Sequence, residues 1–174
     1  MTYEGAHVMK AVLAVVVVLG PAVAARGQDH ASCPMMSKAA EHRAGVDHRH
    51  AAATRVSHDA SVHHFLLAKD GGTIRLDSAP DAPPAGREQI RVHLRHVARS
   101  FAAGNFELPM LIHDQVPPGV PVMKKMKGAI QYAFAETETG GEVRITTRDP
   151  AALAAVHSFL RFQIDDHGTG DPKE

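Results

Sequence analysis

Cysteine and tryptophan are almost missing from this chain. Cys33 is the single cysteine and tryptophan is absent, so a disulfide within the chain is excluded. Aromatic residues make up only 5% of the sequence, which argues against a platform on which nucleic-acid bases stack. Lysine plus arginine and aspartate plus glutamate number 19 each, whereas a nucleic-acid-binding domain normally carries a basic excess. The composition therefore predicts no nucleic-acid partner.

The motifs of the common catalytic sites are also missing. The chain has no G-x-S-x-G, H-E-x-x-H or G-x-x-x-x-G-K-[ST] motif, so it indicates neither a serine hydrolase, a zinc protease nor a nucleotide-binding loop. No nucleotide or organic cofactor is indicated. These absences favour a non-enzymatic role, and an enzyme built on histidines stays open as an alternative.

Histidine is the residue in excess. The chain contains 13 histidines, and histidine is both the commonest metal ligand and the side chain that titrates near neutral pH. The count therefore favours two function classes, metal binding and a response to pH.

Residues 1–25 have the parts of a secretory signal peptide. Lys10 supplies the positive start, Ala11 to Leu19 form an apolar segment of about nine residues, and Ala22-Val23-Ala24 is a cleavage pattern. The apolar segment is too short to span a bilayer. We expect translation to begin at Met9 and the mature protein to be periplasmic or secreted, with no stable membrane span after cleavage.

Residues 26–60 are rich in alanine and histidine and lack a sustained apolar period, which predicts a disordered tail. Cys33 lies beyond the expected cleavage site, which argues against a lipid anchor. A thiolate and two thioethers suit Cu⁺, and imidazole accepts copper or zinc. One interpretation is therefore a mobile metal-binding segment made of His30, Cys33, Met35 and Met36, with His48 and His50 as further ligands of the tail. The other, an exposed thiol without a role, stays open.

Residues 61–168 carry the periodicities of a single α+β domain. Alternating apolar residues predict two β-hairpins, over residues 62–78 and 129–147. Because each hairpin is followed by a predicted helix, the two halves are candidates for a diverged internal duplication. We expect the hairpins to form one antiparallel sheet.

The helices of this domain are predicted from apolar residues at helical spacing. One long helix is expected over residues 87–103, a short one over 122–127, and a second long one from Pro150 to a stop at Gly168. Residues 169–174 are predicted to be a tail. The whole order is ββ-α-α-ββ-α, with the sheet packed against two long helices and one short helix.

Most of residues 62–171 resembles a group of small exported bacterial proteins. The resembling segments are HHFLLAKDGGTIRL, IRVHLRHVARSFAAGNFELPMLIH, VPPGVPVM and GGEVRITTRDPAALAAVHSFLRFQIDDHGTGD. The resemblance implies a single exported domain and assigns neither an activity nor a catalytic residue.

The candidate metal ligands within the domain are His64, His93, His96 and His157. His93 and His96 are three residues apart on a predicted helix, so both rings can reach one ion. His157 lies near the inner face of the last helix, where a histidine needs a hydrogen-bond partner or a metal. His64 belongs to a pair of adjacent strand histidines, of which only one can point inward. Half-exposed or hydrogen-bonded histidines without a ligand are the alternative at each position.

The sequence thus predicts an exported, non-enzymatic protein that binds or buffers a transition metal, with copper ahead of zinc. One alternative is a module of the cell envelope that binds a small ligand or a protein and whose histidines are incidental or pH-sensing. The other is an enzyme in which His64, His93 and His157 converge. The oligomeric state is left open.

Overall fold

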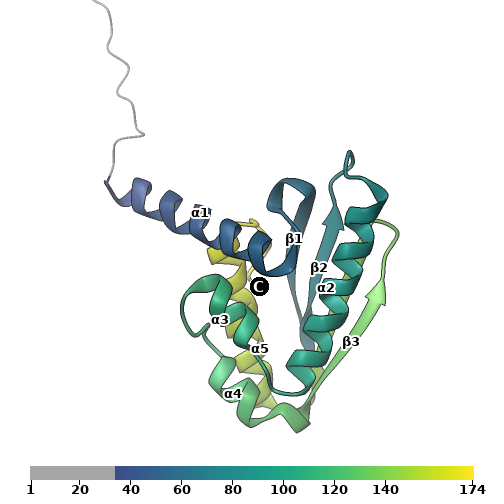
Figure 1. The fold of residues 1–174 in the computed structure, drawn as a ribbon. Helices are drawn as coiled ribbons and strands as arrows, with labels where there is room; N and C mark the ends of the chain where they lie inside the picture. Colours follow the sequence, from purple (N-terminus) through teal and green to yellow (C-terminus); the bar gives the residue numbers. More distant parts are fainter. Residues whose placement is uncertain (1–33) are drawn as a thin grey trace, which may run out of the picture. The chain divides into compact units, whose positions relative to one another are not determined.

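The computed structural model describes residues 34–174 of the chain (Figure 1). Its elements follow in the order α1 (Pro34–Thr54), η2 (His58–Ala60), β1 (Ser61–Ala68), β2 (Gly71–Ser78), α2 (Pro84–Ala102), α3 (Glu107–His113), α4 (Val120–Lys125), η3 (Lys127–Ala129), β3 (Ile130–Glu136), β4 (Gly140–Thr147) and α5 (Pro150–His167). Within these residues, no helix has the length and apolar character needed to cross a membrane.

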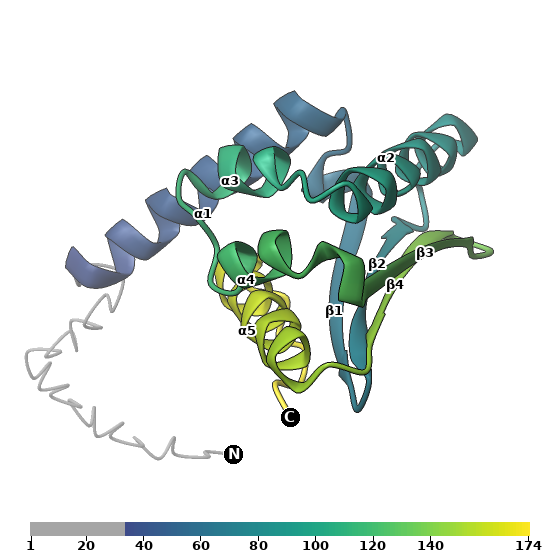
Figure 2. The same ribbon diagram turned by 90° about the horizontal axis from the view of Figure 1, so that it is seen from below.

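One antiparallel sheet of four strands, in the order β1-β2-β4-β3, forms the centre of the domain. β1 and β2 form one hairpin and β3 and β4 the other, and the two hairpins meet where β2 pairs with β4. The helices gather on one side of this sheet (Figure 2). The predicted α+β fold of two hairpins and covering helices is therefore confirmed.

α2 and α5 bury the apolar stripes that cover the sheet. The buried residues of α2 include the four at helical spacing, Ile90, Leu94, Val97 and Phe101. At the start of α5, the Asp149 side chain accepts hydrogen bonds from the amides of Ala151 and Ala152. The helix stops at Gly168, as predicted, and the φ of 64° at that position suits glycine.

α1 lies within the stretch that the sequence predicts as a disordered tail. Val46 and His50 of this helix are buried, and Arg49 donates to the carbonyl of Ile112 at 2.7 Å, so α1 packs against α3 and α5. The predicted tail is therefore wrong for residues 34–60. The reason is compositional, because alanine, histidine and arginine give this helix little contrast between its inner and outer faces.

The two hairpins repeat one sequence pattern at the centre of the sheet. Residues 71–75 and 140–144 both read Gly-Gly-x-(Ile/Val)-Arg. Ile74 and Val143, which are equivalent in this pattern, lie opposite each other where β2 pairs with β4. An approximate two-fold axis therefore passes through this pair and relates β1 to β3, which agrees with the duplication suggested by the sequence.

Candidate functional site

Five histidines from five different elements surround one internal cavity. The cavity has a volume of about 50 Å³, which exceeds the roughly 10–15 Å³ that one water needs. The five residues are His50 of α1, His63 of β1, His93 of α2, His113 at the end of α3 and His167 at the end of α5. Four of them are buried and His93 is partly buried. Core side chains of the sheet, α2 and α5 form most of the remaining wall.

His50 and His63 bring two ring nitrogens together. Nδ1 of His50 donates to the carbonyl of Val56 at 2.9 Å, which in the neutral ring leaves the lone pair on Nε2. That Nε2 lies 3.3 Å from Nε2 of His63, beyond the roughly 2.7–3.2 Å typical of N–H···O hydrogen bonds. Two imidazole nitrogens bound to one tetrahedral zinc ion at about 2.0–2.1 Å lie about 3.3–3.4 Å apart. This distance between the two Nε2 atoms fits either a long hydrogen bond between the rings or two ligands bound to one ion.

His167 and His93 lie beside this pair. The His167 ring stacks on His63 with centroids 5.2 Å apart and meets His50 edge-on at 6.1 Å. The His93 ring meets His50 edge-on at 5.7 Å. Burial of the His93 ring, with a smaller contribution from His96, lowers the pKa of His93 to about 4. At neutral pH this ring is therefore uncharged and has a lone pair to offer.

His113 braces the far side of the cluster. Its Nδ1 donates to Asp166 at 2.5 Å and its Nε2 contacts Oε1 of Gln163 at 2.9 Å, so both ring nitrogens already have protein partners. The ring packs edge-on against His167 at 5.0 Å. The other carboxylate oxygen of Asp166 accepts a hydrogen bond from His42 at 2.8 Å. Asp166 therefore links α1, α3 and α5 around the cavity.

In the described part of the chain, no group of three or more histidine, cysteine, aspartate or glutamate side chains has the geometry of a metal site. Two nitrogens converge, and a third would have to come from rotation of the His167 or His93 ring about its side-chain bonds. The cluster can act chemically in two ways, as a set of neutral imidazole donors or as a buried group of bases.

The predicted pair of His93 and His96 is divided between two environments. His93 lines the cavity, whereas His96 is exposed and its Nε2 lies 3.4 Å from the hydroxyl of Ser100. The structure therefore places one of these two predicted ligands at the cluster and the other outside it.

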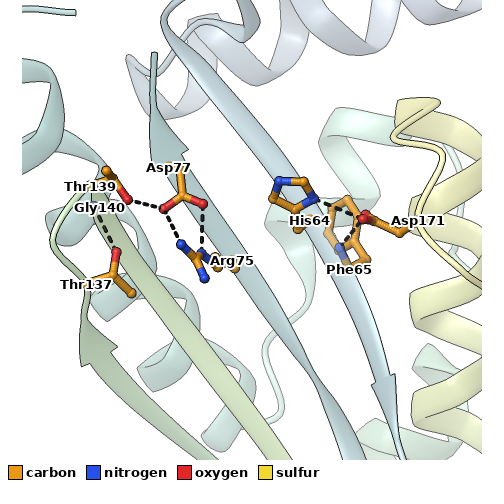
Figure 3. Close-up of polar contacts among 8 residues, drawn as sticks. All are labelled: His64, Phe65, Arg75, Asp77, Thr137, Thr139, Gly140 and Asp171. Atoms are coloured by element: carbon orange, nitrogen blue, oxygen red, sulfur yellow. Dashed lines mark hydrogen bonds and ion pairs between the residues drawn. The ribbon is translucent and has the colours of Figure 1, made fainter. Parts of the chain in front are cut away.

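His64 takes no part in the cavity, because it points to the opposite face of β1 from His63. Its Nδ1 donates to Asp171 at 2.9 Å, and the same carboxylate accepts from the amide of Phe65 at 2.9 Å (Figure 3). Burial raises the pKa of Asp171, but hydrogen bonds from His64, Phe65 and Thr169 outweigh it and hold that pKa below its usual value. His64 therefore fastens the C-terminal segment, predicted as a tail, to the free edge of β1.

His157 lies outside the cavity, beside the turn that joins β1 and β2, where it makes a structural contact. Its Nε2 lies 2.9 Å from the carbonyl oxygen of Ala68 and 3.0 Å from that of Gly71, which ties α5 to the turn between β1 and β2. The convergence of His64, His93 and His157 that an enzyme was predicted to need is not present, since only His93 lines the cavity.

The remaining predicted ligands fall at or before the start of the described chain. His30 and Cys33 lie outside the described residues, as does the predicted signal peptide over residues 1–25. Met35 and Met36 belong to the first turn of α1, and their side chains are also outside the described part. The mobile metal-binding segment therefore stays a prediction.

The sequence predicts two of the five cavity histidines as metal ligands, His93 within the domain and His50 only as part of a mobile tail. The other three, His63, His113 and His167, were not selected. A signal existed for two of them. His63 alternates with the apolar Phe65 along β1 and so shares its inward face, and His167 closes the buried stripe of α5. His50 and His113 carry no comparable local signal, because each becomes buried only through contacts with distant segments.

A scan of protein-family models, a search of curated proteins and a search of solved structures found no match to this chain. Function therefore has to follow from the chemistry of the cavity.

Proposed function

We propose that this chain is an exported protein that binds one transition-metal ion in the cavity of the histidine cluster. His50 and His63 are the first two ligands and His167 is the third. The observation that carries the proposal is the 3.3 Å separation of the two Nε2 atoms, which matches two donors on one tetrahedral ion. The exported location rests on the signal-like first 25 residues.

The surroundings of His50 and His167 support the same role. Metal-binding histidines almost always donate their second ring nitrogen to a carbonyl or carboxylate, which fixes the tautomer and the ring orientation. His50 does so with Val56 at 2.9 Å. His167 is held from the far side by the ring of His113, which is itself fixed by Asp166. The site requires that the His167 ring rotate toward the pair and that Nε2 of His63 carry no proton.

The ligand set decides which metal fits best. Imidazole suits Zn²⁺ and Cu²⁺, whereas Cu⁺ prefers thiolates and thioethers. The cavity is therefore assigned to Zn²⁺ or Cu²⁺, and the soft donors Cys33, Met35 and Met36 are not needed for it. Three protein ligands leave a fourth position that water can occupy, and the cavity of about 50 Å³ provides the room.

Metal retention by the purified full chain tests this proposal. After loading with Zn²⁺ and dialysis, elemental analysis should find about one ion per chain, and His50→Gln and His63→Gln should fall to background. His48→Gln changes an exposed histidine of the same helix and should retain the wild-type content. Wild-type protein that retains neither zinc nor copper, or a His50→Gln variant that keeps its metal, would refute the proposal.

A second candidate function is an acid-sensing module of the cell envelope. It is favoured by the mutual contact of the buried rings of His50, His63 and His167, because protonation would place like charges together inside the protein. Metal-free chain should then change its tertiary structure between about pH 6.5 and pH 4. A near-ultraviolet circular dichroism spectrum that stays constant over this range would exclude it.

A further inference from the structure

The three rings assigned to the metal are closed off from solvent. His50, His63 and His167 are 3%, 6% and 9% exposed. The apolar core of the sheet, α2 and α5 lines most of the cavity. An ion can therefore reach the ligands only where the cavity wall is thin and also faces the outside.

An outer cleft of about 700 Å³ meets that condition. It lies between the end of α1 and α2, and two of its lining residues, His93 and Leu108, also line the cavity. These two side chains therefore form the partition between the cleft and the cavity. His96 lines the cleft as well and offers an imidazole, whereas the carboxylate of Glu88, also in the lining, is paired with Arg95 at 3.0 Å.

His93 has the chemistry to pass an ion across this partition. Its ring meets His50 at 5.7 Å on the inner side, and His96 follows it by one turn of α2 on the outer side. Leu108 is partly buried beside the core and has no donor atom, so it can only close the opening.

We infer that His93 is the transfer residue through which Zn²⁺ or Cu²⁺ moves between the outer cleft and the buried His50–His63 pair. This inference rests on the proposed metal site and adds the route by which the site is loaded. The ion exchanges water or His96 for His93, and then His93 for His50, so only metal–ligand bonds change. His93 sets the rate of loading and release, and the buried ligands set the affinity.

Loading kinetics and equilibrium content of the full chain separate these roles. With Zn²⁺ and a chromophoric chelator in stopped flow, His93→Leu should still bind about one zinc at equilibrium. Zinc loading of this variant, and zinc release from it to the chelator, should both slow by about tenfold or more, because one donor is lost from the path. Leu108→Ala widens the partition without touching a donor and should accelerate both. His48→Gln, an exposed histidine outside the cleft, should leave both rates unchanged.

The outcomes distinguish this inference from the proposed function. Unchanged rates in His93→Leu would overturn the transfer role while the metal site stands. Loss of equilibrium zinc from folded His93→Leu would also overturn it, because His93 would then be a ligand. Wild-type chain that binds no zinc removes the function and the inference together. If circular dichroism shows that His93→Leu is misfolded, the Leu108→Ala variant is the deciding test. Zinc loading and release rates in Leu108→Ala that do not exceed the wild-type rates would overturn the route.

Discussion

The carboxylate of Asp166 lies 2.5 Å from Nδ1 of His113, a ring that is only 1% exposed. Hydrogen bonds to an ionised group are among the stronger ones in proteins. Because the same carboxylate also holds His42 of α1, one side chain connects three helices around the cavity.

Asp166→Asn should lower the free energy of unfolding by about 1–3 kcal/mol, because a buried ring loses its charged partner. Urea denaturation of the metal-free chain measures this loss. Asp165→Asn is the matched control, since Asp165 forms an exposed ion pair with Lys173 whose removal should cost less than about 1 kcal/mol. Equal losses in the two variants would contradict the bracing role of Asp166.

His157→Leu should destabilise the protein and leave its zinc content unchanged. The substitution removes the donor that serves the carbonyls of Ala68 and Gly71, at an expected cost of about 1–2 kcal/mol in urea denaturation. Ser158→Ala changes an exposed neighbour and serves as control. Loss of bound zinc from folded His157→Leu would mean that His157 is a ligand after all.

The metal-free protein should become less stable as the pH falls from about 6.5 to about 4. The pKa of His93 is lowered from 6.5 to about 4 by burial and by His96, so the unfolded chain takes up the proton first and stability declines across this window. Since the ring is partly exposed, His93 alone should account for about 2 kcal/mol of the loss in the free energy of unfolding. Urea denaturation of wild type and His93→Leu at pH 7.5, 6 and 5 measures the difference. If the free energies of unfolding of wild type and His93→Leu fall by the same amount with pH, His93 does not contribute to the pH dependence.

Gly140→Ala should be costly, because a Cβ at this position would lie 2.1 Å from the carbonyl oxygen of Leu76 in the paired strand. Relieving that overlap requires β2 and β4 to separate, at an expected cost of about 1–3 kcal/mol. Gly128→Ala is the control, since nothing lies within 4 Å of its added Cβ, and it should be neutral or stabilising by up to about 1 kcal/mol. Thermal unfolding that ranks the two variants equally would contradict this packing.

Much of the fold could be predicted because its signals are local. The alternation around Ile74 and the helical spacing of Ile90 and Leu94 each fix which face turns inward. α1 lacks such a signal, since Val46 is a single apolar residue among alanines and charged or histidine residues on its face. Its place is set by contacts such as Arg49 with Ile112, which no local window of sequence contains.

The site was harder to predict than the fold because its ligands come from different elements that meet only in the folded chain. Spacing within one helix drew attention to His93 and His96, yet the structure leaves His96 exposed. The closest pair, His50 and His63, comes from a helix and a strand joined by a short connection. Their meeting depends on α1 turning back over the sheet, which residue spacing does not reveal.

α1 supplies His50 to the cavity, and none of the described residues of this helix belongs to the main apolar cluster of the domain. Most of the pocket is lined by the core of the sheet, α2 and α5, so this one ligand comes from outside the scaffold that holds the others. Substitutions along α1 can alter this ligand at little cost to the sheet. The His50 position is thus free to change faster than the core residues that line the rest of the pocket.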